Sequence, residues 1–194
     1  MYDIETHPLE PFLPPHTKLL MLGSFPPPKT RWKMEFYYPN FQNDMWKIFG
    51  ICFFQDKNHF IDLEAKTFKE QEIRDFLREV GVGIYDTAYQ VKRLKGNASD
   101  KFLEVVRPIN LQHLLEKIPD CKHIMTTGEK ATETLLSALP EGAIAPSIGH
   151  TGFAQLNHQS YTLHRMPSSS RAYPIAVEKK AEFYFEMFKT VGLL

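Results

Sequence analysis

Short apolar runs that each end near a glycine constrain this sequence most. Residues 18–22 are followed by Gly23, and residues 123–126 are followed by Gly128 and a helical pattern over residues 131–139. Apolar runs of this length are typical of strands buried on both faces of a parallel sheet. Strands that alternate with helices predict an α/β fold, a three-layer α/β/α sandwich with a mainly parallel central sheet. Ligands of such folds bind beyond the carboxyl ends of the strands.

The rest of the chain supplies further expected elements. Helical patterns cover residues 43–49 with Gly50 at the end, 67–80 with Gly81 as the stop, 102–106, 111–118 and 175–191, and extended segments cover 82–85, 149–157 and 161–166. Residues 1–17 carry four prolines. Proline lacks a backbone donor, so this stretch predicts an extended arm over the body rather than a regular element.

Composition favours one globular domain over residues 1–194. The chain is 43% hydrophobic and 24% charged, which suffices for a sizeable core. The 23 basic and 23 acidic residues cancel, so no net field draws the protein onto a polyanion. Nucleic acid would have to be met by local clusters such as Lys29, Arg31 and Lys33, or Lys92, Arg93 and Lys95 in a middle loop. Ordinary solvated charge is the alternative.

Metal, redox and membrane classes are not indicated. Cys52 and Cys121 are too few for a cysteine-held cluster, and the eight histidines show no metal-binding spacing. No window of about twenty apolar residues and no basic leader is visible. We therefore expect no cofactor, no metal and no membrane contact, and a monomer in a reduced, cytoplasmic setting.

Two distant segments could form the walls of one cleft. Gly23, Ser24, Phe25 and Pro26 follow the first buried strand, and residues 166–170 precede the last helix. Three consecutive prolines from Pro26 onward restrict the first loop. A polar loop with Gly96, Asn97, Ser99 and Asp100 could contribute a further wall. Aromatic residues and one amide between the two walls suit a flat heterocycle better than a peptide or an ester.

These segments, taken in order, carry a resemblance to a known family. The ordered pieces are Gly23-Ser24-Phe25-Pro26, Tyr37-Tyr38, Asn43 with Met45-Trp46, Gly83-Ile84-Tyr85-Asp86, Ser99-Asp100, Gly128-Glu129-Lys130-Ala131 and Pro167-Ser168. A glycine and a proline three residues apart are common by chance, whereas several ordered pieces are not. The chain resembles the uracil-DNA glycosylase superfamily, nearest to the branch that releases hypoxanthine or uracil, and the likeness spans most of its length.

The resemblance implies a DNA glycosylase that hydrolyses the N-glycosidic bond of a flipped-out deaminated base, uracil or hypoxanthine, in DNA repair. Such an enzyme must stack the extruded base and read its edge in a closed pocket. Tyr38 lies five residues before Asn43, which matches the stacking aromatic of the family, although a core tyrosine is the alternative. By the same resemblance Asn43 is the catalytic residue that orients water; a structural asparagine capping the next helix is its rival.

Two positions depart from the family pattern. Phe25 stands where several branches place a carboxylate or amide that positions water, and Met166 stands where some place histidine or asparagine. We expect Phe25 to pack or stack, and assign base binding to Gly23, Ser24, Phe25, Tyr38 and Met166. The departures leave open a second hypothesis, a catalytically silent nucleic-acid-binding module.

The serine-rich segment is expected to hold DNA phosphates through hydroxyls and backbone N–H groups. The residues assigned to this role are Pro167, Ser168, Ser169, Ser170 and Arg171, with plain loop capping as the alternative. Asp86 and Asp100 could orient water or brace a neighbouring loop, and we favour bracing. A hydrolase with Ser24 or Ser168 as nucleophile is disfavoured, because no Gly-x-Ser-x-Gly elbow surrounds either serine.

Overall fold

The computed structural model describes residues 2–95 and 99–194, so the predicted loop residues Gly96 and Asn97 lie outside it. In chain order the elements are β1 (Ile4–Thr6), β2 (Leu19–Gly23), α1 (Met45–Phe54), β3 (Ile61–Asp62), β4 (Thr67–Phe68), α2 (Glu70–Val80), β5 (Val82–Asp86), β6 (Ala88–Arg93), β7 (Leu103–Pro108), α3 (Leu111–Glu116), β8 (His123–Thr127), α4 (Glu129–Ser137), β9 (Thr151–Leu156), β10 (Gln159–Met166) and α5 (Val177–Val191).

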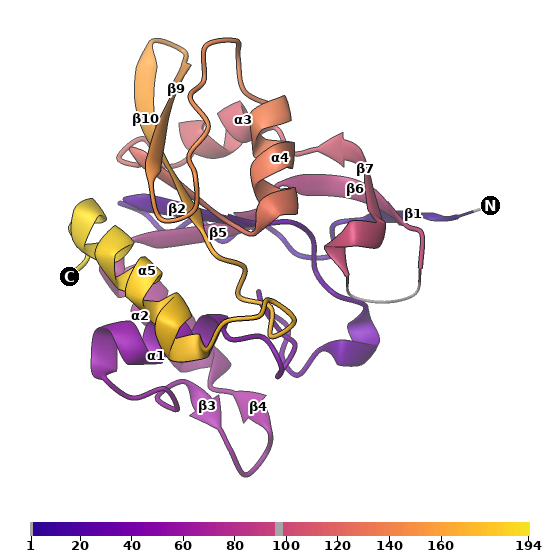
Figure 1. Cartoon of the computed structure of the whole chain (residues 1–194), viewed down its shortest axis with the longest axis vertical. Helices are drawn as coiled ribbons and strands as arrows, with labels where there is room; N and C mark the ends of the chain where they lie inside the picture. Colours follow the sequence, from indigo (N-terminus) through magenta and orange to yellow (C-terminus); the bar gives the residue numbers. More distant parts are fainter. Residues whose placement is uncertain (1, 96–98) are drawn as a thin grey trace.

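A five-stranded sheet forms the centre of the molecule. Its order is β5-β2-β8-β10-β9, and all neighbouring strands are parallel except the edge strand β9. Figure 1 shows α3 and α4 on one side of this sheet and α1, α2 and α5 on the other. The mixed α/β class and the mainly parallel sheet were predicted correctly. Because β2, β5, β8 and β10 run the same way, their carboxyl ends meet at one edge, where parallel sheets place their ligands.

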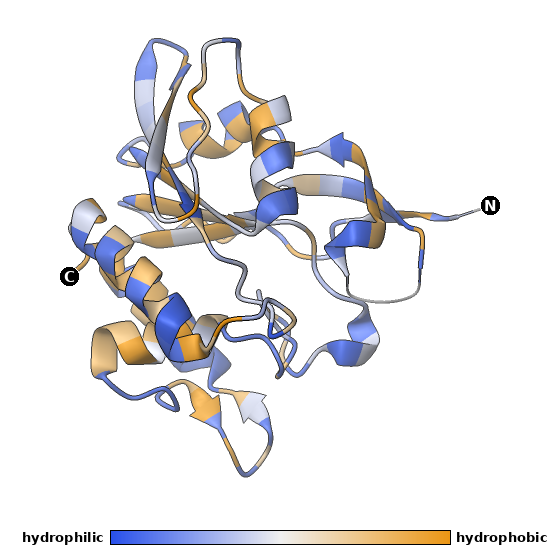
Figure 2. Ribbon diagram, in the orientation of Figure 1, coloured by the Kyte–Doolittle hydropathy of each residue, from blue (hydrophilic) through white to orange (hydrophobic). Residues whose placement is uncertain are grey.

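The sheet lies in the interior of the molecule because its strands are apolar and are covered by helices on both faces. Every residue of β2 and of β5 is buried, as expected for strands covered on both faces. Figure 2 shows the central strands and α1 coloured mainly as hydrophobic. The helix α2 is amphipathic instead: Ile73 and Leu77 are buried, while its charged residues lie on other faces.

A second, antiparallel sheet of order β1-β6-β7 corrects three sequence predictions. The proline-rich arm contains a regular strand, β1, which pairs with β6. Lys92 and Arg93 lie in β6 rather than in a loop, and residues 103–106, predicted as helical, belong to β7. The β-branched pair Val105 and Val106 favours a strand, and this preference outweighed the helical spacing.

Several helix limits also differ from the prediction, those of α1 and α2 most clearly. The helix α1 continues through Gly50 to Phe54, and its C-cap Gln55 has a left-handed φ of 55°. Gly50 permits a close backbone approach, because a Cβ there would lie 2.3 Å from the carbonyl oxygen of Asp56. Thr67 and Phe68 form the short strand β4, so α2 begins only at Glu70.

Candidate functional site

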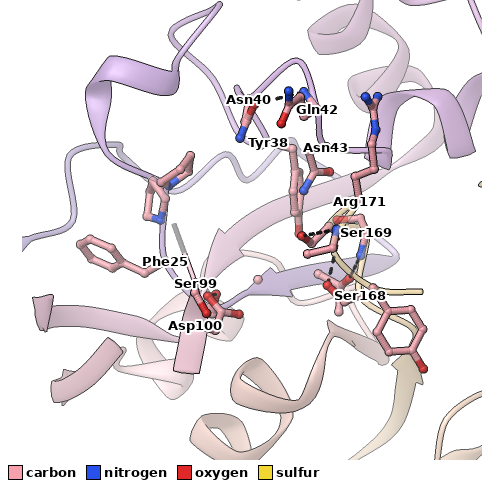
Figure 3. Close-up of a pocket in the computed structure, with 18 of the residues that line it drawn as sticks. Phe25, Tyr38, Asn40, Gln42, Asn43, Ser99, Asp100, Ser168, Ser169 and Arg171 are labelled. Atoms are coloured by element: carbon pink, nitrogen blue, oxygen red, sulfur yellow. Dashed lines mark hydrogen bonds between the residues drawn. The ribbon is translucent and has the colours of Figure 1, made fainter. Parts of the chain in front are cut away.

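A pocket of about 520 Å³ lies beyond the carboxyl ends of the parallel strands. Figure 3 shows Tyr38 and Asn43 between the Ser168–Ser169 segment and the side that carries Phe25 and Asp100. The lining residues include Gly23, Ser24, Phe25, Arg31, Tyr37, Tyr38, Asn40, Gln42, Asn43, Asp86, Ser99, Asp100, Lys101, Thr127, Ser168, Ser169, Ser170, Arg171 and Tyr173. The structure thus brings both predicted walls to one cavity.

Gly23 forms the floor at the end of β2. A Cβ at this position would lie 2.4 Å from Asp86 Oδ1 and 3.2 Å from the Tyr38 hydroxyl oxygen, so no larger residue fits without moving the carboxylate. The next residue, Ser24, donates its hydroxyl to Asp100 Oδ1 at 2.9 Å. That hydrogen bond ties the end of β2 to the segment that precedes β7.

Phe25 closes one side of the cavity. Its ring packs against the small cluster of Ala88, Val91 and Leu103 and meets the His7 ring edge-on at 5.3 Å between centroids. The guanidinium of Arg93 lies 5.8 Å from the ring centroid. Phe25 therefore packs against the antiparallel sheet while it lines the pocket, as expected of a residue that offers no polar group to water.

Tyr38 has a strained backbone beside the cavity. Its φ is 52°, in the left-handed region that bulky residues rarely adopt. Trp46 holds the preceding turn, because its indole N–H donates to the carbonyl of Tyr37 at 3.0 Å. The Tyr38 hydroxyl is buried and has no hydrogen-bond partner within the described residues. Burial, with smaller contributions from Asp86, Tyr184 and Asp100, holds the pKa of Tyr38 well above its usual value, so the phenol stays neutral.

Asn43 lines the same pocket and also makes a structural contact. Its Oδ1 accepts a hydrogen bond from the backbone N–H of Met45 at 2.9 Å, at the start of α1. The N-cap of α1 is Asp44, so this contact braces the turn before the helix and is not the helix cap that the structural interpretation predicted. The same contact fixes the carboxamide, whose NH₂ group and second oxygen lone pair stay available for a ligand. Both uses of the side chain are compatible in this geometry.

The serine-rich segment is held by hydrogen bonds to other parts of the protein and within its own loop. Ser169 N–H donates to Thr127 Oγ1 at 3.3 Å, and Ser170 N–H donates to Ser168 Oγ at 3.2 Å. These two backbone N–H groups are therefore already hydrogen-bonded within the protein. This agrees with loop capping, the alternative to phosphate binding for this segment. The hydroxyl hydrogens of Ser168 and Ser170 and the exposed guanidinium of Arg171 remain as donors toward an anion.

Two of the predicted site residues do not line the pocket. Met166 is 2% exposed and borders a separate cavity of about 300 Å³ between β10 and α5, so the structure does not bring it to the pocket that the other predicted base-binding residues line. Pro167 is buried, and its carbonyl accepts hydrogen bonds from Tyr184 at 3.0 Å and from Thr127 at 3.3 Å. The Pro167 ring is therefore not exposed to a phosphate. The hydrogen bonds to its carbonyl hold the start of the serine-rich segment.

A buried ion pair joins the serine-rich wall of the cleft to the turn that carries Asn43. Lys180 in α5 is completely buried, and its Nζ lies 3.0 Å from Asp44 Oδ2 and donates to the carbonyl of Ser170 at 2.7 Å. The backbone N–H of Asp44 also donates to the carbonyl of Ser169 at 2.9 Å. The residue that follows Asn43 is therefore tied directly to the serine-rich segment.

Two carboxylates lie in the pocket, and both brace other parts of the structure, as predicted. Asp86 Oδ2 lies 2.7 Å from His7 Nε2, and both side chains are buried. Asp100 accepts from Ser24, as described above. Burial raises the pKa of Asp100, and the neighbouring Asp86 raises it further, against the opposing effects of Ser24, Lys130 and Arg93.

The basic clusters divide between structural and surface roles. Arg93 pairs with Glu5 at 3.0 Å and donates to the carbonyl of Pro26 at 3.0 Å, which braces the first wall. Arg31, Lys101 and Arg171 are exposed and line the pocket. Three exposed cations thus line the cavity together with the carboxylates of Asp86 and Asp100, in a chain whose formal net charge is zero.

Sequence reasoning missed His7 and Lys180. Lys180 precedes Tyr184 and Met187 at intervals of four and seven residues, so the sequence places a lysine on the apolar face of a helix. A charged residue at such a position indicates a buried partner and could have been noticed. His7 lies between Thr6 and Pro8 in the arm, where no periodicity marks it.

Metal and membrane features were also sought in the described part of the chain. Within residues 2–95 and 99–194, no group of three or more histidine, cysteine, aspartate or glutamate side chains is placed to hold a metal ion. Over the same residues, none of the helices has both the length and the apolar character needed to cross a membrane.

Comparisons with known proteins bear on the fold. No protein-family model and no curated protein matches the sequence. Among solved structures, the chain is similar to the solution NMR structure of a protein from Methanosarcina acetivorans described as a "putative Uracil DNA glycosylase". The two are 21% identical, the match covers 98% of this chain and 99% of that chain, and the TM-score is 0.65. The two chains therefore share a fold over nearly their whole lengths.

Proposed function

We propose that the protein is a monofunctional DNA glycosylase, built on a three-layer α/β/α sandwich, that hydrolyses the N-glycosidic bond of a flipped-out uracil or hypoxanthine in DNA. The observation that carries the proposal is the meeting of Tyr38, Asn43 and Ser168 around one cavity at the carboxyl edge of the parallel sheet. The fold shared with the Methanosarcina acetivorans protein supports the same activity.

The proposed roles follow from the geometry of the pocket. Tyr38 offers a ring held by a strained backbone, and strain of this kind is most often kept at functional sites. Stacking of a base on such a ring contributes about 1–3 kcal/mol. Asn43, fixed by its contact with Met45 N–H, orients the water that attacks the sugar. The hydroxyls of Ser168 and Ser170, together with Arg171, hold the adjacent phosphates.

Oligonucleotides with a single uracil, hypoxanthine or guanine-paired thymine, in single and double strands, test the proposal. The wild-type protein is expected to release a base and leave an alkali-labile site in at least one of them. Asn43→Ala is expected to reduce the release rate by orders of magnitude while the protein stays folded. No release from any substrate would contradict the proposal.

A matched variant separates catalysis from a structural contact at the start of a helix. Asn110 is the N-cap of α3 and accepts a hydrogen bond from His113 N–H at 3.1 Å, away from the pocket, so like Asn43 it uses its side-chain oxygen to hold a backbone N–H near the start of a helix. Asn110→Ala should cost about 1 kcal/mol of stability and leave base release unchanged. If both substitutions reduce release equally, Asn43 has only a structural role.

The alternative is a nucleic-acid-binding module without chemistry. It is favoured by Phe25, which gives the first wall no group that could position water, and by the engagement of Asn43 Oδ1 with Met45. Tight, salt-dependent DNA binding by a wild-type protein that releases no base would support this alternative over the glycosylase.

A further inference from the structure

Tyr38 adopts a conformation that only its surroundings can maintain. Its φ of 52° is unfavourable for a bulky side chain, and its buried hydroxyl has no hydrogen-bond partner within residues 2–95 and 99–194. Both features raise the free energy of the folded state, and such a residue keeps its conformation only where the neighbouring structure holds it there. The contacts of the turn that carries Tyr38 therefore decide where its ring lies.

Helix α1 holds the backbone of this turn. The indole N–H of Trp46 donates to the carbonyl of Tyr37, which belongs to the peptide bond that joins Tyr37 to Tyr38. Trp46 is completely buried, and its ring meets the Tyr38 ring edge-on at 6.0 Å between centroids. This contact fixes the peptide bond before Tyr38, whereas the side chain of Tyr37 is held by another segment.

The N-terminal arm holds the side chain of Tyr37. The Tyr37 hydroxyl donates to the backbone carbonyl of Glu10 at 2.8 Å, and only 3% of Tyr37 is exposed. Burial, with smaller contributions from Asp86 and other nearby groups, holds the pKa of Tyr37 far above its usual value, so the phenol keeps the proton that it donates. Glu10 is otherwise exposed, so its part in this contact is that of a backbone acceptor.

The arm is fixed on both sides of Glu10. On one side, the backbone N–H of His7 donates to the carbonyl of Tyr89 in β6 at 2.8 Å. On the other side, Phe12 and Ile84 in β5 exchange two backbone hydrogen bonds, at 2.8 Å and 3.0 Å. Because β6 and β5 belong to different sheets, the Glu10 carbonyl is anchored to both of them. The turn that donates to this carbonyl shares that anchorage.

We infer that Tyr37 is a positioning residue: through its hydrogen bond to the N-terminal arm, it holds the ring of Tyr38 where a flat base can stack on it. The inference rests on the proposed function, in which the extruded base stacks on that ring. It adds the N-terminal arm to the parts of the chain that build the base site. Stacking acts on the bound base both before and during bond cleavage, so loss of the hydrogen bond should weaken substrate binding rather than slow the chemical step.

Tyr37→Phe tests this hydrogen bond, because it removes the hydroxyl and keeps the buried ring. With the DNA substrate that the wild-type protein cleaves, it should raise KM about 3- to 10-fold and leave kcat within about 2-fold of the wild-type value, as expected for the loss of one hydrogen bond between neutral groups. Glu10→Ala keeps the carbonyl and should change neither constant. Tyr161→Phe is the matched control at a tyrosine that is 6% exposed and outside the pocket, and should change neither.

Hydrogen exchange of the free protein tests the positioning role without chemistry. The backbone N–H of Lys33 donates to the carbonyl of Pro39 at 2.9 Å, so exchange at Lys33 reports opening of the loop that contains Tyr37 and Tyr38. Tyr37→Phe should accelerate this exchange about 3- to 10-fold, the free energy of one neutral hydrogen bond expressed as a rate ratio. Tyr161→Phe should leave the exchange rate unchanged, since Tyr161 lies in β10, outside the pocket.

The two measurements separate this inference from the proposed function. A wild-type protein that releases no base would contradict the glycosylase, and the dissociation constant for uracil- or hypoxanthine-containing DNA would then replace KM in the same comparison. A wild-type protein that neither releases a base nor binds this DNA would overturn both proposals.

Three other results would overturn the inference alone. The first is an unchanged exchange rate at Lys33, or an unchanged KM, in Tyr37→Phe. The second is a lower kcat with an unchanged KM, since Tyr37 would then act on the chemical step. The third is an equal effect of Tyr37→Phe and Tyr161→Phe, which would show a general loosening of the fold.

Discussion

Replacing Lys180 with methionine tests whether the buried ion pair holds the serine-rich segment against the turn that carries Asn43. The side chain of Lys180 is completely buried and that of Asp44 is 7% exposed, so solvent cannot replace the lost ammonium group. Lys180→Met leaves an uncompensated carboxylate and removes the donor to the carbonyl of Ser170. Removal of one partner from a buried pair typically costs about 3–5 kcal/mol. Arg171, whose Nε lies 3.8 Å from Asp44 Oδ1, could offset part of this cost.

Urea unfolding followed by tryptophan fluorescence measures the effect. We expect Lys180→Met to lower the free energy of unfolding by about 3 kcal/mol or more. The neighbouring Lys179 is 61% exposed and pairs with Glu182 on the surface, so Lys179→Met should change it by less than about 1 kcal/mol. The double variant Lys180→Met with Asp44→Asn should be more stable than Lys180→Met alone, because the buried charge is gone. Equal, small effects of both lysine substitutions would refute the reasoning.

Three further predictions concern the pocket. Gly23→Ala should reduce base release and cost about 1–3 kcal/mol of stability, because the new Cβ would lie 2.4 Å from Asp86 Oδ1. A variant with the release rate and the urea midpoint of the wild type would contradict this. Arg171→Ala should weaken DNA binding equally for all sequences and reduce the slope of log K against log salt by about 1, as measured by fluorescence anisotropy; an unchanged slope would remove Arg171 from the phosphate contacts. Burial raises the pKa of Asp100 above its ordinary 3.8, so the unfolded chain releases this proton first and the wild-type stability should fall as pH rises from 3.8 through the raised value. Asp100→Asn should flatten that part of the curve, and an identical profile would show that the carboxyl group is not responsible.

The parallel core could be predicted because its sequence signal is local. Residues 18–22, 82–85 and 123–126 are short segments with apolar centres, and they became β2, β5 and β8 almost without change in their limits. Such runs fit a strand buried on both faces and little else when glycine follows closely. Since parallel strands end at one edge, the position of the pocket followed from the same signal.

The antiparallel sheet could not be predicted in the same way. The strand β1 has three residues in a proline-rich segment, and it exists because it pairs with residues 90–92, more than eighty positions away. Local propensity contains no information about that partner. The role of His7 depends on the same long-range pairing, which is why nothing in the sequence indicated it.

Site residues were predicted where a motif and a strand end coincided. Gly23, Tyr38, Asn43 and Ser168 all line the pocket, whereas Met166, one residue before the turn, lies on the far side of its strand. Successive residues of a strand face opposite sides, so a motif alone does not decide which one faces the ligand.

The most direct test of the central claim is a crystal structure with DNA that carries a 2′-fluoro-deoxyuridine, in which the glycosidic bond resists cleavage. The account predicts that the uracil lies outside the helix in the pocket, stacked on the ring of Tyr38, with its C1′ beside the carboxamide of Asn43 and a phosphate near Ser168. A uracil that remains paired in the duplex, or that lies on another face of the protein, would contradict the account.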